Sequence, residues 1–250
     1  MRRKFDIQYD GGNYVPIDTG AGGGIAEVSG QYGNAINSGY NTDYTFPSDV
    51  STGSLIVICI ARTATTGQVP VNADITFSGT AVMASTNPST DQTHWHTASI
   101  GGVEYTLGVF SALVTTGGTL TVNNNDPDSV YVTTMHCNEY SGNWDGTRTE
   151  DSATGNDTGA DDVPVDTADV TSVGAALFVG LCYHSEGGYT GFPAAAEWTE
   201  KGTRWNGDAL RSRYIHQIVS TGTTDKPEWN PTSPSNFYSW NAIGVVYKEA

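Results

Sequence analysis

Charged side chains, cysteines and long apolar runs are all scarce in this sequence. Only 15% of its 250 residues are charged, and its three cysteines are widely spaced, whereas about 25% of an average soluble domain is charged. The longest apolar run, Leu55–Ala61, is far shorter than the roughly 20 residues that a membrane-spanning helix needs. We therefore expect no membrane association and no disulfide framework. Cys59, Cys137 and Cys182 are predicted to be buried free thiols.

Basic residues are also few, and this limits the partners to be expected. The chain has 27 acidic and 11 basic residues and a net charge of −16, which repels phosphate and argues against nucleic acid. The basic Met1–Lys4 segment is followed by polar residues and glycines rather than by an apolar segment, so we expect no secretory signal. Free thiols are consistent with assembly in a reducing cytoplasm.

The first 42 residues differ in character from the rest. They contain nine glycines, show no sustained apolar period, and begin with Arg2, Arg3 and Lys4. We predict an extended, glycine-rich N-terminal arm over residues 1–42 that becomes ordered by docking on a partner. From Asp43 onward, short β-branched or alternating runs are separated by Gly, Asn, Asp and Pro turns, a pattern typical of β-strands.

The β-rich part repeats itself, which is the most informative feature of the sequence. Gly53–Ala61 matches Gly174–Cys182, and Leu113–Gly117 matches Ile218–Gly222. The two units run from about 43 to 143 and from about 161 to 248, joined by an acidic connection at 144–160. We predict an all-β antiparallel sandwich of which each tandem half supplies one half and in which Gly53 overlays Gly174; two small sandwiches are the alternative. The predicted core contains Leu55, Val57, Cys59, Ile75, Phe77, Leu177, Val179 and Trp198.

Two clusters have the residue types of a metal site. Eight acids between Asp145 and Asp169 could bind Ca²⁺, but the order of a calcium-binding loop is absent, and a solvated connection is the simpler interpretation. His94 and His96 could bind a transition metal, but no third ligand is identifiable. We expect no metal and no cofactor.

No catalytic motif is apparent. Glu197 and Glu200 are predicted to share a strand but to lie on opposite faces, and no nucleophile elbow, phosphate-binding loop or His-Glu-x-x-His segment occurs. We therefore expect a protein without enzymatic activity.

Tryptophan could provide a surface for stacking sugars. Trp198 and Trp229 occupy repeat positions that Ile75 and Val122 fill in the first unit, which predicts core positions. The remaining candidates lie in turn-like surroundings and are the candidate glycan-contacting residues: Trp95, Trp144 and Trp205.

Several of these segments resemble a pattern found in many tailed-phage structural proteins. The matching segments are Gly53–Val57, Ser78–Thr80 and Glu139–Gly142, with weaker second copies at Gly174–Phe178 and Val246–Lys248. The resemblance covers residues 43–248 and implies a jelly-roll-like β-sandwich on a virion. Because it rests on structural motifs, it carries an expectation about fold and location rather than about chemistry.

The expected function is that of a non-enzymatic bacteriophage virion protein, a capsid decoration or cement protein exposed on the particle surface. It would attach to the major capsid protein or another virion protein, form a homo-oligomer on the particle, and be assembled in the host cytoplasm. The alternative is a head-fibre or tail protein, or a carbohydrate-binding module, that recognises cell-surface glycan. The arm residues predicted to contact the partner are Arg2, Arg3, Lys4, Phe5, Ile7, Tyr9, Tyr14, Val15 and Ile17.

Overall fold

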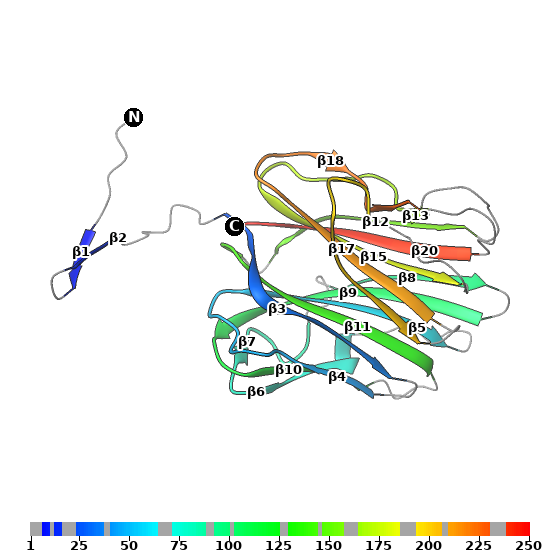
Figure 1. Cartoon of the computed structure of the whole chain (residues 1–250), viewed down its shortest axis with the longest axis horizontal. Helices are drawn as coiled ribbons and strands as arrows, with labels where there is room; N and C mark the ends of the chain where they lie inside the picture. Colours follow the sequence, from blue (N-terminus) through cyan, green and yellow to red (C-terminus); the bar gives the residue numbers. More distant parts are fainter. Residues whose placement is uncertain are drawn as a thin grey trace.

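The computed structural model is built from antiparallel β-strands (Figure 1). It describes residues 7–10, 13–16, 24–37, 41–64, 72–88, 93–100, 103–125, 130–144, 147–157, 165–185, 194–206, 210–230 and 239–250. Within these ranges the one helical element is a short 3-10 turn, η1 (Asn72–Asp74), and no helix is long and apolar enough to cross a membrane. The predicted all-β sandwich is confirmed.

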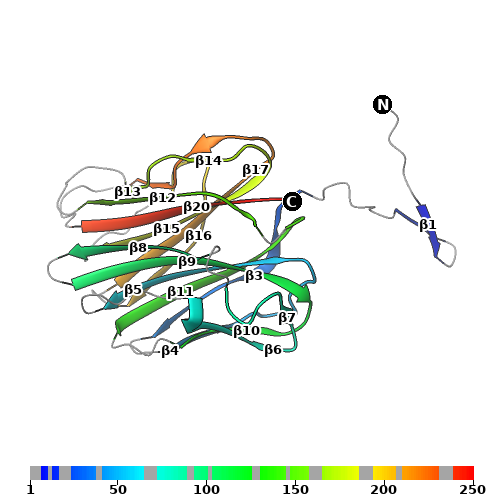
Figure 2. The same cartoon turned by 180° about the vertical axis from the view of Figure 1, so that it is seen from behind.

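Two large sheets pack face to face at the centre of the body (Figures 1 and 2). The first has the order β3-β11-β5-β9, with β8 and β7 pairing along the far edge of β9; the second has the order β12-β20-β15-β17-β16. The first sheet comprises β3 (Ala26–Asn37), β5 (Leu55–Ala64), β7 (Val82–Met83), β8 (Thr93–Ile100), β9 (Val103–Thr116) and β11 (Val130–Ser141). The second comprises β12 (Thr149–Asp157), β15 (Ala176–Ser185), β16 (Thr199–Asn206), β17 (Leu210–Val219) and β20 (Ser239–Lys248).

Smaller sheets cover the outer face of each large sheet, so the body has four layers. The first outer layer is a three-stranded sheet of order β4-β10-β6, and the second consists of two short strand pairs, β13 with β19 and β14 with β18. The strands of these layers are β4 (Asn41–Thr45), β6 (Ile75–Gly79), β10 (Leu120–Asn125), β13 (Val165–Asp166), β14 (Val170–Thr171), β18 (Thr224–Asp225) and β19 (Glu228–Trp229).

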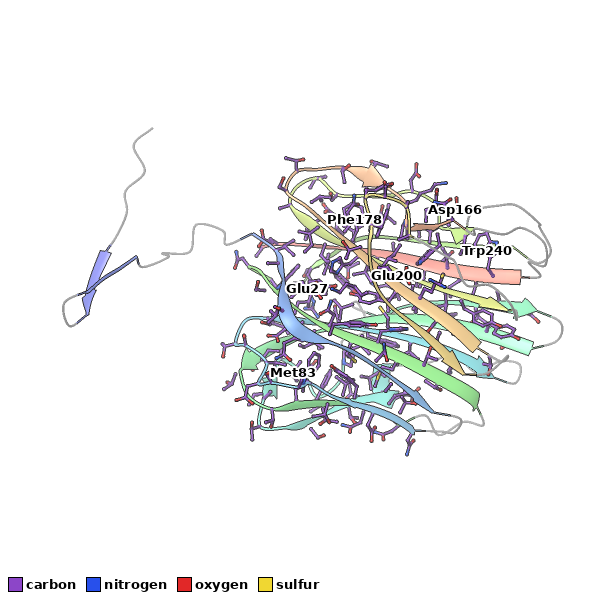
Figure 3. The ribbon with its side chains drawn as sticks, viewed as in Figure 1. Glu27, Met83, Asp166, Phe178, Glu200 and Trp240 are labelled. Atoms are coloured by element: carbon purple, nitrogen blue, oxygen red, sulfur yellow. The ribbon has the colours of Figure 1, made fainter. Side chains whose placement is uncertain are left out.

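The four layers enclose three apolar cores. Alternate residues of β5 serve two of them: Leu55 and Val57 face the second large sheet, while Ile56 faces the first outer layer. This explains the nearly continuous apolar run of β5, because a strand buried on both faces needs no polar side. The third core lies between the second large sheet and its outer layer and includes Phe178 and Trp240 (Figure 3).

The predicted core is confirmed at seven of its eight positions, all but Phe77, which is only partly buried. Phe77 lies on β6, the edge strand of an outer layer, and lines a shallow groove with Val82 and Met83. Trp198 and Trp229 are core residues as predicted, and all three cysteines are buried free thiols.

The predicted boundaries of the arm and the acidic connection are too wide. Residues 26–37, which lie in the predicted arm, form β3 and pair with β11. Residues 149–157, which lie in the predicted connection, form β12 and pair with β20. Both are edge strands, and their polar, glycine-containing sequences lack the apolar alternation that revealed the inner strands.

The remaining part of the arm contains a hairpin. β1 (Ile7–Asp10) pairs antiparallel with β2 (Asn13–Pro16), and in Figures 1 and 2 the hairpin lies apart from the four layers. Ile7, Tyr9, Tyr14 and Val15 belong to it. The other predicted contact residues lie outside the described ranges: Arg2, Arg3, Lys4, Phe5 and Ile17.

Two paired glycines allow the outer layer to approach the second large sheet closely. Gly180 of β15 lies opposite Gly244 of β20, and Pro227 packs over both. A Cβ atom added at Gly180 would lie 2.7 Å from Pro227 Cβ, and one added at Gly244 would lie 2.8 Å from Pro227 Cγ. Side chains are therefore excluded here, because the outer layer approaches the sheet too closely.

Candidate functional site

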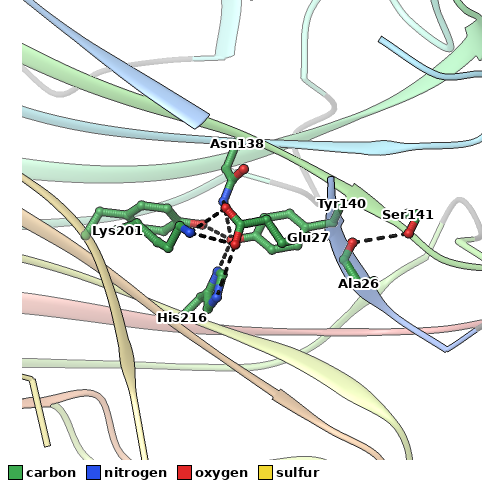
Figure 4. A network of polar contacts seen from close by, with 8 residues as sticks. Ala26, Glu27, Asn138, Tyr140, Ser141, Lys201 and His216 are labelled. Atoms are coloured by element: carbon green, nitrogen blue, oxygen red, sulfur yellow. Dashed lines mark hydrogen bonds and ion pairs between the residues drawn. The ribbon is translucent and has the colours of Figure 1, made fainter. Parts of the chain in front are cut away.

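A group of hydrogen-bonded polar side chains lies between the two large sheets, where β3 and β11 face β16 and β17. We call this the inter-sheet cluster and define it by Glu27, Asn138, Tyr140, Lys201, Tyr214 and His216; Figure 4 shows most of it. Its members come from four strands, so it connects both sheets.

Glu27 is the centre of the inter-sheet cluster. The ammonium nitrogen of Lys201 lies 2.6 Å from its carboxylate oxygens, and the Asn138 side-chain amide donates a hydrogen bond to Oε1 over 3.1 Å. His216 Nε2 is 3.9 Å from Oε2. Glu27 therefore joins β3 to its neighbour β11 and to the opposite sheet.

A chain of hydrogen bonds continues inward from Glu27. The Tyr140 hydroxyl lies 2.5 Å from both the Tyr214 hydroxyl and His216 Nδ1, and it accepts a hydrogen bond from Asn138. With the Nε2–H of a neutral His216 directed at Glu27, Nδ1 is left to accept the Tyr140 proton, and Tyr214 donates to the Tyr140 oxygen.

Burial shifts the pKa of each titratable group along this chain. Removal from water lowers the pKa of His216 to about 4; Glu27 opposes this shift and Lys201 adds to it. Burial also raises the pKa values of Tyr140 and Tyr214 well above that of a free phenol. At neutral pH the imidazole and both phenols are therefore uncharged, as buried groups prefer.

A second polar group extends the cluster toward the middle of the interface. His136 Nε2 lies 2.9 Å from the Ser212 hydroxyl, which lies 2.6 Å from the Thr134 hydroxyl. On its other side, His136 Nδ1 lies 3.1 Å from the Tyr32 hydroxyl. Strands β3, β11 and β17 are thus linked by polar contacts as well as by the apolar core.

The order carboxylate, imidazole, hydroxyl resembles that of an acid–base relay, but the surroundings of the hydroxyl do not suit catalysis. Tyr140 is fully buried, and its raised pKa keeps it protonated. A nucleophile needs access to a substrate and activation by its base. Only the outer end of the cluster reaches solvent, where the side chains of Glu27 and Lys201 are 23% and 18% exposed. The geometry is that of a connection between sheets.

The three candidate glycan-contacting tryptophans differ in their surroundings. Trp95 on β8 is 50% exposed. The prediction that Trp144 lies at the surface is wrong. Its indole packs into the central core and donates a hydrogen bond to the Tyr140 carbonyl over 3.2 Å. Trp205 belongs to β16, of which the structure describes the backbone but not this side chain.

The predicted acidic and histidine clusters do not converge in the part of the chain that the structure describes. No group of three His, Cys, Asp or Glu side chains placed to hold a metal is found there. Asp151 accepts hydrogen bonds from the Ser152 and Thr171 amides, and His94 Nε2 lies 3.2 Å from the Thr149 hydroxyl. Glu200 forms an ion pair with Arg213, and Glu197 is exposed.

Sequence reasoning did not identify the inter-sheet cluster. Glu27 and Lys201 are 174 positions apart, and no local spacing connects them. One signal was available: Tyr140 and His216 lie in otherwise apolar, alternating strands. A polar residue on the inward face of such a strand requires a buried partner.

In comparisons with known proteins, no family model, no curated protein and no solved structure matches the chain.

Proposed function

We propose that this protein is a non-enzymatic structural component of a bacteriophage virion, a capsid decoration protein that attaches through its N-terminal arm and exposes its β-sandwich on the particle. The observation that carries the proposal is the anchorage of the arm. The arm leads into β3, and Glu27, near the start of β3, binds side chains from both large sheets.

This anchorage suits an attachment segment. A force on the arm is passed through Glu27 to β11 by hydrogen bonding and to β16 by the ion pair with Lys201. Sheet pairing along β3 adds a row of backbone hydrogen bonds. The whole body then resists the load, instead of one loosely held strand.

The composition of the arm supports docking on another protein. Its hairpin carries Ile7, Tyr9, Tyr14 and Val15, and Arg2, Arg3 and Lys4 precede it on a chain of net charge −16. An apolar hairpin with a basic end fits an acidic surface with apolar pockets on the major capsid protein, and the remaining negative charge keeps unbound copies apart in solution.

Deletion of residues 2–20 tests the attachment. The truncated protein retains β3, so we expect an unchanged unfolding midpoint but at least a tenfold loss of binding to undecorated particles in co-sedimentation. A matched variant that keeps the hairpin and replaces Arg2, Arg3 and Lys4 by Gln separates charge from shape. Equal binding of truncated and full-length protein would overturn the proposal.

Trp95 favours a second candidate function, glycan recognition by a fibre or tail protein. Its half-exposed indole lies on the edge strand β8, and an exposed aromatic ring can stack on a sugar ring. Titration of cell-surface glycans should change Trp fluorescence in the native protein and not in Trp95→Ala. Val173→Ala, at a residue that is 85% exposed, is the control.

A further inference from the structure

The two large sheets have the same topology. In chain order, the first unit contributes β3, β5, β8, β9 and β11, and the second contributes β12, β15, β16, β17 and β20. Each set is arranged as first, fifth, second, fourth and third strand across its sheet. Each unit also places its own outer layer on the outward face.

Strand registers identify the equivalent residues. Leu55 lies opposite Tyr140 on one side and Leu113 on the other. Leu177 lies opposite Tyr247 and Ile218 in the same way. These pairs place Leu55 with Leu177, Leu113 with Ile218 and Tyr140 with Tyr247.

The contacts between the sheets are unchanged when the two units are exchanged. β3 faces β16, and β12 faces β8. β11 faces β17, and β20 faces β9. β5 faces both β17 and β15, and β15 faces both β9 and β5. Reciprocal contacts of this kind are the signature of a two-fold axis, on which each surface patch meets its equivalent.

Individual contacts repeat in the same manner. The Tyr140 hydroxyl contacts His216. At the equivalent positions, Tyr247 faces Ser111, which partly offsets the rise in the Tyr247 pKa that burial causes. The distance and angles between Ser111 and the Tyr247 hydroxyl are not those of a hydrogen bond. Glu27 lies opposite Tyr140 in register as Thr149 lies opposite Tyr247.

The Glu27–Lys201 ion pair also has a counterpart. Thr149 contacts His94 of β8, the strand equivalent to β16. At the ends of the two units, the equivalent residues Asn143 and Ala250 contact each other, because the Ala250 amide donates to the Asn143 carbonyl over 2.7 Å. Equivalent residues that touch lie close to the axis.

We propose that the chain is a two-fold pair of units and that the inward face of each large sheet is a dimerisation surface whose partner is a second unit of the same kind. The differences between equivalent contacts then favour pairing of unit 1 with unit 2 over pairing of two identical units. Unit 1 (residues 24–144) supplies Glu27, and unit 2 (residues 147–250) supplies Lys201. If two copies of unit 2 paired, Lys201 would face Thr149 and lose its carboxylate, which disfavours the pairing.

The test uses the folded full-length protein with a specific protease site inserted between Asp145 and Gly146. After cleavage, the two pieces are expected to elute together from gel filtration as a 1:1 complex at micromolar concentration. Glu27→Lys should weaken their association at least tenfold, and adding Lys201→Glu should restore it. Ser29→Lys, on the exposed part of the same strand, also introduces a lysine and should have little effect.

Further measurements keep the test decisive if Glu27→Lys fails to fold. Glu27→Gln preserves shape and should weaken association in the same direction by a smaller factor. A crystal structure should superpose unit 1 on unit 2 by a rotation close to 180°. Separation of the wild-type pieces, no restoration by the reversed pair, or a rotation far from 180° would overturn the proposal.

Discussion

The Tyr140 hydroxyl and His216 Nδ1 are 2.5 Å apart, although the two residues belong to different sheets and to different sequence units. Both side chains are buried, so this hydrogen bond forms where water cannot replace either partner. A contact of that kind contributes little while it is intact, but its loss is costly, because the remaining group stays unsatisfied.

Tyr140→Phe should therefore destabilise the protein by about 1–3 kcal/mol. The substitution removes one hydroxyl and leaves His216, Tyr214 and Asn138 without a shared partner. Urea unfolding followed by fluorescence gives the change. Tyr247→Phe is the matched control at the equivalent position, and little or no loss is expected because that hydroxyl has no hydrogen-bond partner. Equal losses would contradict this account of the cluster.

Acid should weaken the fold through His216. Its pKa is about 4 in the folded protein and near 6.5 when exposed, so between these values the unfolded chain binds the additional proton. This contribution to stability is complete above about pH 6.5 and is lost as the pH falls toward 4, on the order of 3 kcal/mol in total.

Urea titrations from pH 7 to pH 4 measure this slope. His216→Ser, which installs the residue found at the equivalent position of the first unit, should have a visibly flatter profile over the same range. Glu27 and Lys201 face the imidazole and are present in both proteins, so the two proteins differ only by the imidazole and its interactions. Parallel profiles would show that His216 is not the titrating group.

The central core should be sensitive to truncation of β5. Leu55 is fully buried between the sheets, so Leu55→Ala should cost about 2–5 kcal/mol. Val82 is 52% exposed, and Val82→Ala should change stability by no more than about 0.5 kcal/mol. Phe77→Ala should fall between them, because Phe77 is only partly buried. Thermal or urea unfolding of the three variants gives the order directly.

Side chains added at the glycine pair should separate the second sheet from its outer layer. Gly244→Ala would place a methyl group against Pro227, and we expect a loss of about 1–3 kcal/mol from overpacking. Pro227→Ala in the same protein should recover part of the loss, since it removes the obstructing ring atoms. No recovery would mean that backbone strain, and not the contact with Pro227, causes the effect.

Local patterns in the sequence were sufficient for the inner strands and insufficient for register. Alternation and β-branched runs located β5 and β15, but matching Gly53 with Gly174 places Leu55 against Ala176. The observed pairings place it against Leu177. A slip of one residue moves every side chain to the other face of the sheet, and only the partner strand's register could reveal it.

The edge strands and the inter-sheet cluster depend on distant partners. β3 is held in place by pairing with β11. The role of Glu27 depends on its ion pair with Lys201, which lies far along the chain. Trp144 shows the same limit: its neighbours in sequence resemble a turn, yet its indole lies in the central core. Burial of such residues is decided by packing that no short window contains.

Because its three cysteines are buried, the native protein is expected to be unreactive toward thiol reagents. Burial raises the pKa of each thiol well above its usual value, so neither the reactive thiolate nor a path to it is present in the folded state. A single cysteine introduced on the surface, for example at Val173, would then be the one position that a maleimide dye labels. Fluorescent or cross-linking probes could thus be placed at a chosen site without first removing the natural thiols, and labelling at the other three would report unfolding.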